Sequence, residues 1–355
     1  MTPHHTPHHT PLHTPLHTLH LSAPGGTQAQ VACAQGTRVL DALLDAGWQV
    51  PHSCRRGVCQ SCRARLVAGT LQAPRLAGGD VLLCQATVMG DARLALDRLE
   101  VAPPPQRLAS QARIRRLRRV AADVVHVELR LPNGVHAHWQ AGQSLELRAP
   151  DGTARSYSLA RPPLGDLSLH LHIRLLPGGR FSQWLEQALA EPQPPTTTLS
   201  VRLPFGSLGL PPDGRRSAIL LASGTGFSAL GAIAEAAIQR RDPRPLHLYW
   251  GVRRAADLYD LARAEAFARD HPALRFIPVV SESAPGQAWT GRSGLVHQAV
   301  MHDFADLTDV EVLACGAPAM LEAAQQAFRA ERGLPASQWR SDAFHPAPLW
   351  ASRPT

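Results

Sequence analysis

The segment "PHSCRRGVCQSCRARL" (residues 51–66) places three of the chain's six cysteines within nine positions. Cys54, Cys59 and Cys62 follow the spacing C-x4-C-x2-C, and Cys84 comes after 21 further residues in "VLLCQA". The N-terminus has no charged region followed by an apolar stretch, so we expect a cytoplasmic chain whose thiols stay reduced. Clustered cysteines in that compartment bind metal or do chemistry more often than they form disulfides.

Four thiolates can hold one Zn²⁺ or a [2Fe-2S] cluster. Structural zinc prefers two short C-x2-C hooks, whereas this chain has one loop and one distant cysteine. This arrangement is the plant-type ferredoxin spacing and predicts a [2Fe-2S] cluster, with zinc as the alternative. Residues 19–100 therefore resemble a plant-type ferredoxin of the β-grasp fold, on "PHSCRRGVCQSCRARL" and "LLCQA". Gln60 departs from the many relatives that carry Gly, and Cys33 fits no ligand spacing.

Residues 1–18, "MTPHHTPHHTPLHTPLHT", repeat with a period of four and contain no core-forming pattern. We expect a disordered His/Pro/Thr tail there. Seven histidines up to His20 leave open a second reading, in which the tail binds a divalent metal.

The proline-rich "VAPPPQ" (101–106) predicts a linker that ends the first domain at residue 100. Residues 107–211 alternate apolar and polar positions between Pro and Gly breaks, which predicts a small antiparallel β-barrel. Over residues 212–355 apolar strand cores alternate with helical patterns, which is typical of an open parallel α/β sheet. The chain is therefore predicted to be multidomain, with an α+β domain, a β-barrel and an α/β domain in that order.

The formal net charge of +8 raises the question of nucleic-acid binding. The chain has no lysine, so all 36 basic residues are arginine, and with 31 prolines this indicates a GC-rich genome. The densest basic patch, "RIRRLRR" (113–119), resembles the exposed side of a strand more than a nucleic-acid surface. No apolar run approaches the ~20 residues of a membrane span. We expect neither a nucleic-acid nor a membrane partner, and we expect a monomer.

Two short motifs in the predicted barrel suit a flavin. "ARSYSLA" places Arg155, Tyr157 and Ser158 on one strand, where the arginine can meet a phosphate, the ring can pack on isoalloxazine and the hydroxyl can bond flavin N5. Alone this motif is weak, and an ordinary barrel strand would be the favoured explanation of it. "GGRFSQWL" then places Gly179 and Ser182 at a helix start, whose free N–H groups can hold a pyrophosphate.

Two motifs in the predicted α/β domain suit a dinucleotide. "LLASGTGFSAL" is a strand followed by Gly224-Thr225-Gly226 and a helix, although no acidic residue closes the next strand. "VLACGAPAM" places Cys315 and Gly316 at the end of a late strand, where ligands bind in open parallel sheets. By itself Cys315 would more often be a small buried hydrophobe.

Together, residues 107–355 resemble the ferredoxin–NADP reductase superfamily, because matching segments follow in order: "RSYS", "GGRFS", "PFG", "GTG", "YWGVR", "CGAP" and "DAF". With the ferredoxin in front, the chain is similar to the single-chain reductase component of bacterial multicomponent oxygenases. The resemblance implies FAD, NADH or NADPH and a [2Fe-2S] cluster, with electrons passing from nicotinamide through flavin to the cluster and then to a partner oxygenase. Reductases of CDP-glucoseen sugar deoxygenation and a non-enzymatic electron-transfer or sensing subunit are the alternatives.

The resemblance also implies roles for individual residues. The flavin-binding residues are Arg155, Tyr157, Ser158, Gly179 and Ser182. The dinucleotide-binding residues are Gly224, Thr225, Gly226, Arg253, Cys315 and Gly316. Ser158 and Cys315 lie nearest the chemistry, and Phe344, or less readily Trp350, shields a flavin face.

Two further expectations concern the choice of nicotinamide cofactor and the electron outlet. Glu282 follows Ser281 where NADPH-dependent relatives carry a serine–arginine pair, so a carboxylate faces the 2′-phosphate and NADH is predicted; Arg253-Arg254 is the counter-argument. The outlet for electrons is expected around Arg55, Arg56 and Val58.

Overall fold

The computed structural model describes residues 15–53, 55, 57, 60–101, 106–191, 197–211, 214–282 and 289–344. The chain forms two compact units. The first contains Met1–Val50 and Arg63–Pro104, and the second contains Pro51–Cys62 and Pro105–Thr355. Within the described residues no helix is long and apolar enough to cross a membrane.

The first unit is built on a five-stranded mixed sheet in the order β2-β1-β6-β4-β5. Its strands are β1 (Leu16–Ser22), β2 (Gln28–Ala34), β4 (Arg63–Gln72), β5 (Asp80–Leu82) and β6 (Thr87–Leu96). Only β1 and β6 pair in parallel; the other neighbours are antiparallel. The remaining elements are α1 (Val39–Asp45), η1 (Pro24–Gly26), η2 (Ala77–Gly79) and a ribbon of β3 (Trp48–Gln49) with β7 (Glu100–Val101).

The first strand begins earlier than the sequence predicts. Leu16 pairs with Ala34, so residues 16–18, which we assigned to the tail, belong to β1. In the sequence only Leu19 and Leu21, which are buried, show a strand pattern. The antiparallel pairing with β2 extends from them back to Leu16. Residues 1–14 of the predicted tail, and 102–105 of the predicted linker, lie outside the described residues.

The second unit opens with an antiparallel lobe, a six-stranded sheet in the order β11-β10-β13-β8-β9-β12 with α2 (Arg180–Ala190) packed on it. Its strands are β8 (Leu108–Ala121), β9 (Val124–Arg130), β10 (Ser144–Arg148), β11 (Ala154–Ser158), β12 (Ser168–Arg174) and β13 (Thr198–Phe205). The N–H of Ala160, just after β11, donates to the carbonyl oxygen of His170 on β12 at 2.8 Å. The two edges of this sheet are therefore brought together.

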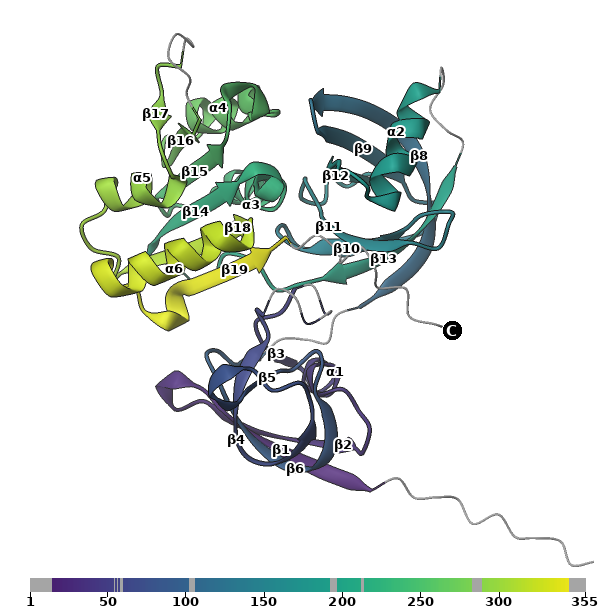
Figure 1. Cartoon of the computed structure of the whole chain (residues 1–355), viewed down its shortest axis with the longest axis vertical. Coiled ribbons are helices and arrows are strands. Elements are labelled where there is room, and N and C mark those ends of the chain that lie inside the picture. Colours follow the sequence, from purple (N-terminus) through teal and green to yellow (C-terminus); the bar gives the residue numbers. More distant parts are fainter. Residues whose placement is uncertain are drawn as a thin grey trace, which may run out of the picture. The chain divides into compact units, whose positions relative to one another are not determined.

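The second unit continues with a parallel lobe, a six-stranded sheet in the order β17-β16-β15-β14-β18-β19 in which every pairing is parallel (Figure 1). Its strands are β14 (Ser217–Ser223), β15 (Leu246–Val252), β16 (Leu274–Val280), β17 (Arg292–Ser293), β18 (Val310–Gly316) and β19 (Trp339–Ala343). Its helices are α3 (Phe227–Gln239), α4 (Leu261–Asp270), α5 (Val296–Asp303), α6 (Pro318–Arg332), η3 (Gly224–Gly226), η4 (Ala255–Asp257) and η5 (Ala336–Gln338).

Helices cover both faces of the parallel sheet, which explains why its strands read as continuous apolar runs. Along β14, Leu220 packs in the core under α3 and α4, whereas Ile219 and Leu221 pack in the core under α5 and α6. The order of strands along the chain reverses between β14 and β18. Such a switch point leaves a crevice at the carboxyl ends of the two strands, and this position organises the site described next.

Candidate functional site

Ser158 ends β11 and is buried, with 6% of its surface exposed. Its Oγ has no hydrogen-bond partner among the residues that the structure describes. A buried hydroxyl without a partner costs about 1–3 kcal/mol, so such atoms are normally satisfied by a ligand or water. The residue predicted to bond flavin N5 therefore has its hydroxyl available, and this feature fits a flavin.

The two predicted flavin motifs are brought together by aromatic packing. The ring of Tyr157 on β11 lies 5.5 Å, centroid to centroid, from that of Phe181 in the first turn of α2. Gly179 is the N-cap of α2, so the free amides of the helix lie in the same first turn as Phe181. The Oγ of Ser182 accepts a hydrogen bond from the N–H of Leu176 at 2.9 Å and can still donate its own proton. Arg155 donates from Nη1 to the carbonyl oxygen of Ala154 at 2.8 Å.

The predicted dinucleotide loop and the Cys-Gly pair meet at the switch point. Ala222 of β14 pairs with Cys315 of β18, so both loops leave adjacent strands. A Cβ atom added at Gly226 would lie 2.0 Å from the carbonyl oxygen of Cys315. A Cβ atom added at Gly316, whose φ is +146°, would lie 2.1 Å from Ser223 Oγ. Both glycines are therefore required by close backbone approach.

Cys315 is fully buried near the carboxyl end of β18. Burial, and then the carboxylate of Asp342, raises the pKa of its thiol well above the ordinary value. The thiol is therefore neutral, and it contributes a small polarisable surface and no nucleophilic thiolate. The N–H of Phe344 donates to the carbonyl oxygen of Gly316 at 2.9 Å, which places Phe344 beside the same strand end. Trp350 lies outside the described residues.

Arg253 lies apart from this group of residues. Its side chain is 79% exposed, and its Nε lies 4.0 Å from Oε1 of Glu282. The N–H of Glu282 donates to the carbonyl oxygen of Arg253 at 2.8 Å, so the two residues form one corner after β15 and β16.

Sequence reasoning missed Arg174 and Trp250. A Cβ atom at Gly224 would lie 2.9 Å from Nη2 of Arg174, so this guanidinium from β12 covers the dinucleotide loop. Trp250 donates from Nε1 to the carbonyl oxygen of Gly224 at 2.9 Å and stacks on Phe227 at 3.9 Å. In the sequence, Arg174 could be recognised only as an arginine at the end of a predicted strand. Gly224, the residue that it covers, lies 50 residues further along the chain.

Cys62 and Cys84 are both buried, and Cys54 and Cys59 lie outside the described residues. The side-chain amide of Gln85 donates to Cys84 Sγ at 3.6 Å and to its carbonyl oxygen at 2.9 Å. In the part of the chain that the structure describes, no three His, Cys, Asp or Glu side chains are grouped so as to hold a metal ion. The four predicted ligands therefore stay a prediction.

The segment Pro51–Cys62 belongs to the second unit, and its described residues make polar contacts there. The N–H of His52 donates to Ser207 Oγ at 3.1 Å, and the N–H of Ser207 donates back to the carbonyl oxygen of His52 at 3.1 Å. Ser61 Oγ donates to the carbonyl oxygen of Ser341 at 3.2 Å, and Ser53 Oγ donates to the carboxylate of Asp342.

The expected electron outlet is only partly described. Arg55 is half-buried, with its guanidinium carbon 5.7 Å from the ring centroid of Phe205. The sequence does not reveal this cation–π contact. Arg56 and Val58 lie outside the described residues.

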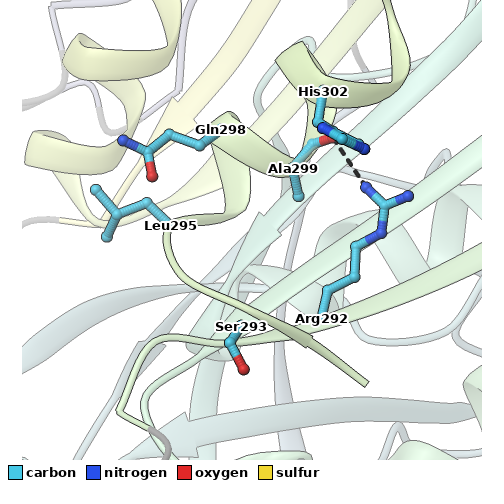
Figure 2. Close-up of a pocket in the computed structure, with 6 residues that line it drawn as sticks. All are labelled: Arg292, Ser293, Leu295, Gln298, Ala299 and His302. Carbon is cyan, nitrogen blue, oxygen red and sulfur yellow. Dashed lines mark hydrogen bonds between the residues drawn. The ribbon is translucent and has the colours of Figure 1, made fainter. Parts of the chain in front are cut away.

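The pocket in Figure 2 lies next to β17 and α5 and has a volume of about 340 Å³. It is lined by Arg292, Ser293, Leu295, Gln298, Ala299 and His302. Arg292 donates to the carbonyl oxygen of Ala299 at 3.2 Å and also pairs with Asp303. No predicted site residue lines this pocket, and we assign it no ligand.

Three family models match successive parts of the chain. Family models described as "2Fe-2S iron-sulfur cluster binding domain", "Oxidoreductase FAD-binding domain" and "Oxidoreductase NAD-binding domain" match residues 23–89, 111–209 and 220–326. The predicted [2Fe-2S], FAD and NAD(P)H cofactors are thereby confirmed.

Similar proteins align along almost the whole chain. Reductase component 1 of terephthalate 1,2-dioxygenase from Comamonas sp is 33% identical over 89% of this chain and 94% of its own length. CDP-6-deoxy-L-threo-D-glycero-4-hexulose-3-dehydrase reductase from Yersinia pseudotuberculosis is 33% identical over 87% and 93%. The crystal structure of the Amycolatopsis cytochrome P450 reductase GcoB matches 93% of this chain and 100% of its own, with a TM-score of 0.73 at 31% identity. The chain therefore belongs to the family of single-chain iron–sulfur flavoprotein reductases, which transfer electrons from NAD(P)H through FAD to a [2Fe-2S] cluster.

Proposed function

We propose that the chain is the reductase component of a bacterial multicomponent oxygenase and passes electrons from NADH to a separate oxygenase protein. The observation that carries this proposal is that one compact unit holds both the Ser158 region and the carboxyl ends of β14 and β18, where the strand order reverses. The chain is similar over 89% of its length to a protein named as a dioxygenase reductase component, and this similarity supports an oxygenase as the partner.

Three groups of residues would hold the cofactors. Cys54, Cys59, Cys62 and Cys84 would bind the cluster. Arg155, Tyr157, Ser158, Gly179 and Ser182 would bind FAD, and Gly224, Thr225, Gly226, Arg174, Arg253, Cys315 and Gly316 would surround the dinucleotide. Bound FAD supplies the conversion of a two-electron hydride into single electrons, which a [2Fe-2S] cluster accepts one at a time.

The chain's own residues would contribute orientation and electrostatics. The buried Ser158 hydroxyl would donate a hydrogen bond to the flavin ring. Arg174, over Gly224, would neutralise phosphate charge at the start of α3, where the free amides of the helix already favour an anion. The neutral Cys315 would pack beneath the nicotinamide, and Phe344 would cover the flavin face until nicotinamide displaces it. No general acid–base pair is required.

We also propose how the cofactors divide among the parts of the fold. The five-stranded sheet with α1 would be a β-grasp ferredoxin domain that begins with β1 at Leu16 and ends with β7 at Val101, with the tail before it and the linker after it. The antiparallel lobe would be the FAD-binding barrel at 107–211, and the parallel lobe the NAD-binding domain at 212–355. We propose a cytoplasmic monomer that binds no nucleic acid.

Sugar deoxygenation is the second candidate, favoured by the likeness to the Yersinia hexulose-dehydrase reductase over 87% of this chain. A non-enzymatic electron-transfer subunit is disfavoured by the presence of every cofactor motif. Metal binding by the tail stays a prediction, and a chain that begins at residue 15, which keeps β1 complete, tests it.

The deciding experiment couples the purified chain to an oxygenase encoded beside it and to a CDP-hexulose dehydrase in parallel. We expect NADH-dependent turnover with the oxygenase alone. That turnover should fall as salt rises, because small transient encounters are steered by charge, while NADH-to-ferricyanide activity should fall much less. Turnover only with the dehydrase would establish the second candidate. Stoichiometric hydroxylation of a substrate by the chain alone would refute both.

A further inference from the structure

The carboxylate of Glu235 is one of the links between the two lobes of the second unit. Glu235, on α3, accepts a hydrogen bond on Oε1 from Nη2 of Arg161 at 2.7 Å and on Oε2 from Nη2 of Arg263 at 2.6 Å. Arg161 follows β11 in the antiparallel lobe, whereas Arg263 lies on α4 in the parallel lobe. The side chains of Glu235 and Arg263 are only 13% and 14% exposed, so this pair is less screened than a surface ion pair.

Arg263 also contacts the antiparallel lobe directly. The same Nη2 donates to the carbonyl oxygen of Ala160 at 3.0 Å. Its Nη1 donates to Asp260 at 3.1 Å, and its guanidinium lies 5.2 Å from the ring centroid of Phe267. A planar guanidinium can satisfy these partners at once because its donors point in fixed directions.

Short stretches of the chain connect these contacts to both candidate cofactor regions. Ala160 lies two residues beyond Ser158, and its N–H is fixed by the carbonyl oxygen of His170. Glu235 lies on the helix that begins directly after Gly226, so its displacement moves the dinucleotide loop as part of one helix.

We propose that Arg263, with Glu235 and Arg161, is a positioning clamp that sets the distance between the nicotinamide and the flavin. The inference rests on the cofactor positions in the proposed function. None of the three residues is assigned to a cofactor. Hydride transfer requires reacting atoms about 3–3.5 Å apart, and a displacement of about 1 Å can cost about 100-fold in rate. A clamp between the two lobes acts on that distance directly.

The test compares Arg263→Lys with Arg269→Lys in the FAD-loaded, full-length chain. Arg269 lies on the same helix, but it is exposed and pairs only with the exposed Asp270 among the described contacts. Lysine keeps the charge at position 263 but loses the fork that reaches Glu235, Asp260 and Ala160 together. Stopped-flow reduction of the flavin at saturating NADH should slow about tenfold in Arg263→Lys, with the NADH dissociation constant changed by less than about twofold. Arg269→Lys should match the wild type.

A spectroscopic readout separates positioning from general damage. The long-wavelength charge-transfer absorbance of nicotinamide stacked on flavin should weaken in Arg263→Lys and in Glu235→Gln. The thermal unfolding midpoint should change little in either variant. If Arg263→Lys fails to fold, Arg161→Lys, which alters the more exposed end of the clamp, takes its place with the same expected losses. Flavin reduction within about twofold of wild type in the clamp variants, with unchanged charge-transfer absorbance, overturns the proposal. Failure of the wild type itself to reduce its flavin with NADH would instead overturn the proposed function.

Discussion

Arg253 and Glu282 form one corner of the parallel lobe, with Nε and Oε1 4.0 Å apart and a backbone hydrogen bond of 2.8 Å between them. The arginine that could have gripped a 2′-phosphate therefore has a carboxylate as its neighbour. A phosphate dianion arriving there meets the repulsion of Glu282 as well as the attraction of Arg253. This relationship supports the predicted preference for NADH.

Glu282→Gln should therefore improve the use of NADPH. We expect kcat/KM for NADPH to rise about tenfold, about 1.4 kcal/mol, while kcat/KM for NADH changes by less than about twofold. Steady-state rates with both cofactors measure the effect, and Glu322→Gln, an exposed acid on α6, is the matched control. A wild-type chain with the lower Michaelis constant for NADPH would contradict the assignment.

Ser158→Ala should affect flavin chemistry and leave folding intact. Because the hydroxyl has no partner among the described residues, its removal should leave the unfolding temperature of the flavin-free protein unchanged or slightly raised. Flavin reduction by NADH should slow about tenfold, because a hydrogen bond to the ring is lost. Ser110→Ala on β8 is the control. Normal reduction kinetics in Ser158→Ala would show that the hydroxyl does not face the reacting part of the flavin.

Cys84→Ser should abolish the cluster and leave flavin reduction by NADH largely intact. The flavin and nicotinamide residues lie in the second unit, whereas Cys84 belongs to the first. Cys33→Ser is the matched control, because Cys33 is also a buried thiol of the first unit and fits no ligand spacing. Iron, acid-labile sulfide and visible absorbance give the readout. Stoichiometric zinc without acid-labile sulfide in the wild type would refute the ferredoxin assignment.

Gln85→Leu should lower the reduction potential of the cluster. The amide of Gln85 donates to Cys84 Sγ at 3.6 Å, and hydrogen bonds to ligand sulfurs stabilise the reduced, more negative cluster. Redox titration followed by electron paramagnetic resonance measures the potential. Gln72→Leu, at the end of β4, serves as the control. An unchanged potential in Gln85→Leu would mean that this hydrogen bond is not kept when the cluster is bound.

The cofactor motifs could be predicted from the sequence, but the contacts that position them could not. Cysteine spacing and the order of "RSYS", "GTG" and "CGAP" are local, because each chemical task restricts neighbouring residues. The clamp is different: Arg161 meets Glu235 across 74 positions, and Arg263 meets Ala160 across 103. Each of these arginines is one among many in a chain without lysine, so only the tertiary fold distinguishes them. The same holds for Arg174, and for Arg55 over Phe205.

Three histidines on adjacent strands predict acid sensitivity. His126 Nε2 lies 3.2 Å from Nδ1 of His170, and His172 Nδ1 lies 3.2 Å from Ser228 Oγ on α3. Burial, and then nearby positive charge, lowers the pKa of His126 to about 4; burial also lowers the pKa of His170, and lowers that of His172 well below its ordinary value. The charged groups acting on them are Arg116, Arg118, Arg161, Arg263, Glu128 and Asp166.

Because the folded state holds these rings neutral, the unfolded state binds more protons below about pH 6.5. The contribution of these histidines to stability is therefore complete above that pH and is lost as the pH falls. For His126, whose pKa is about 4 in the folded protein, the slope reaches at most about 1.4 kcal/mol per pH unit. Thermal unfolding between pH 7.5 and pH 5 should show this decline, and His126→Gln should make it shallower. A slope that is the same in the wild type and in His126→Gln would show that this histidine does not titrate with unfolding.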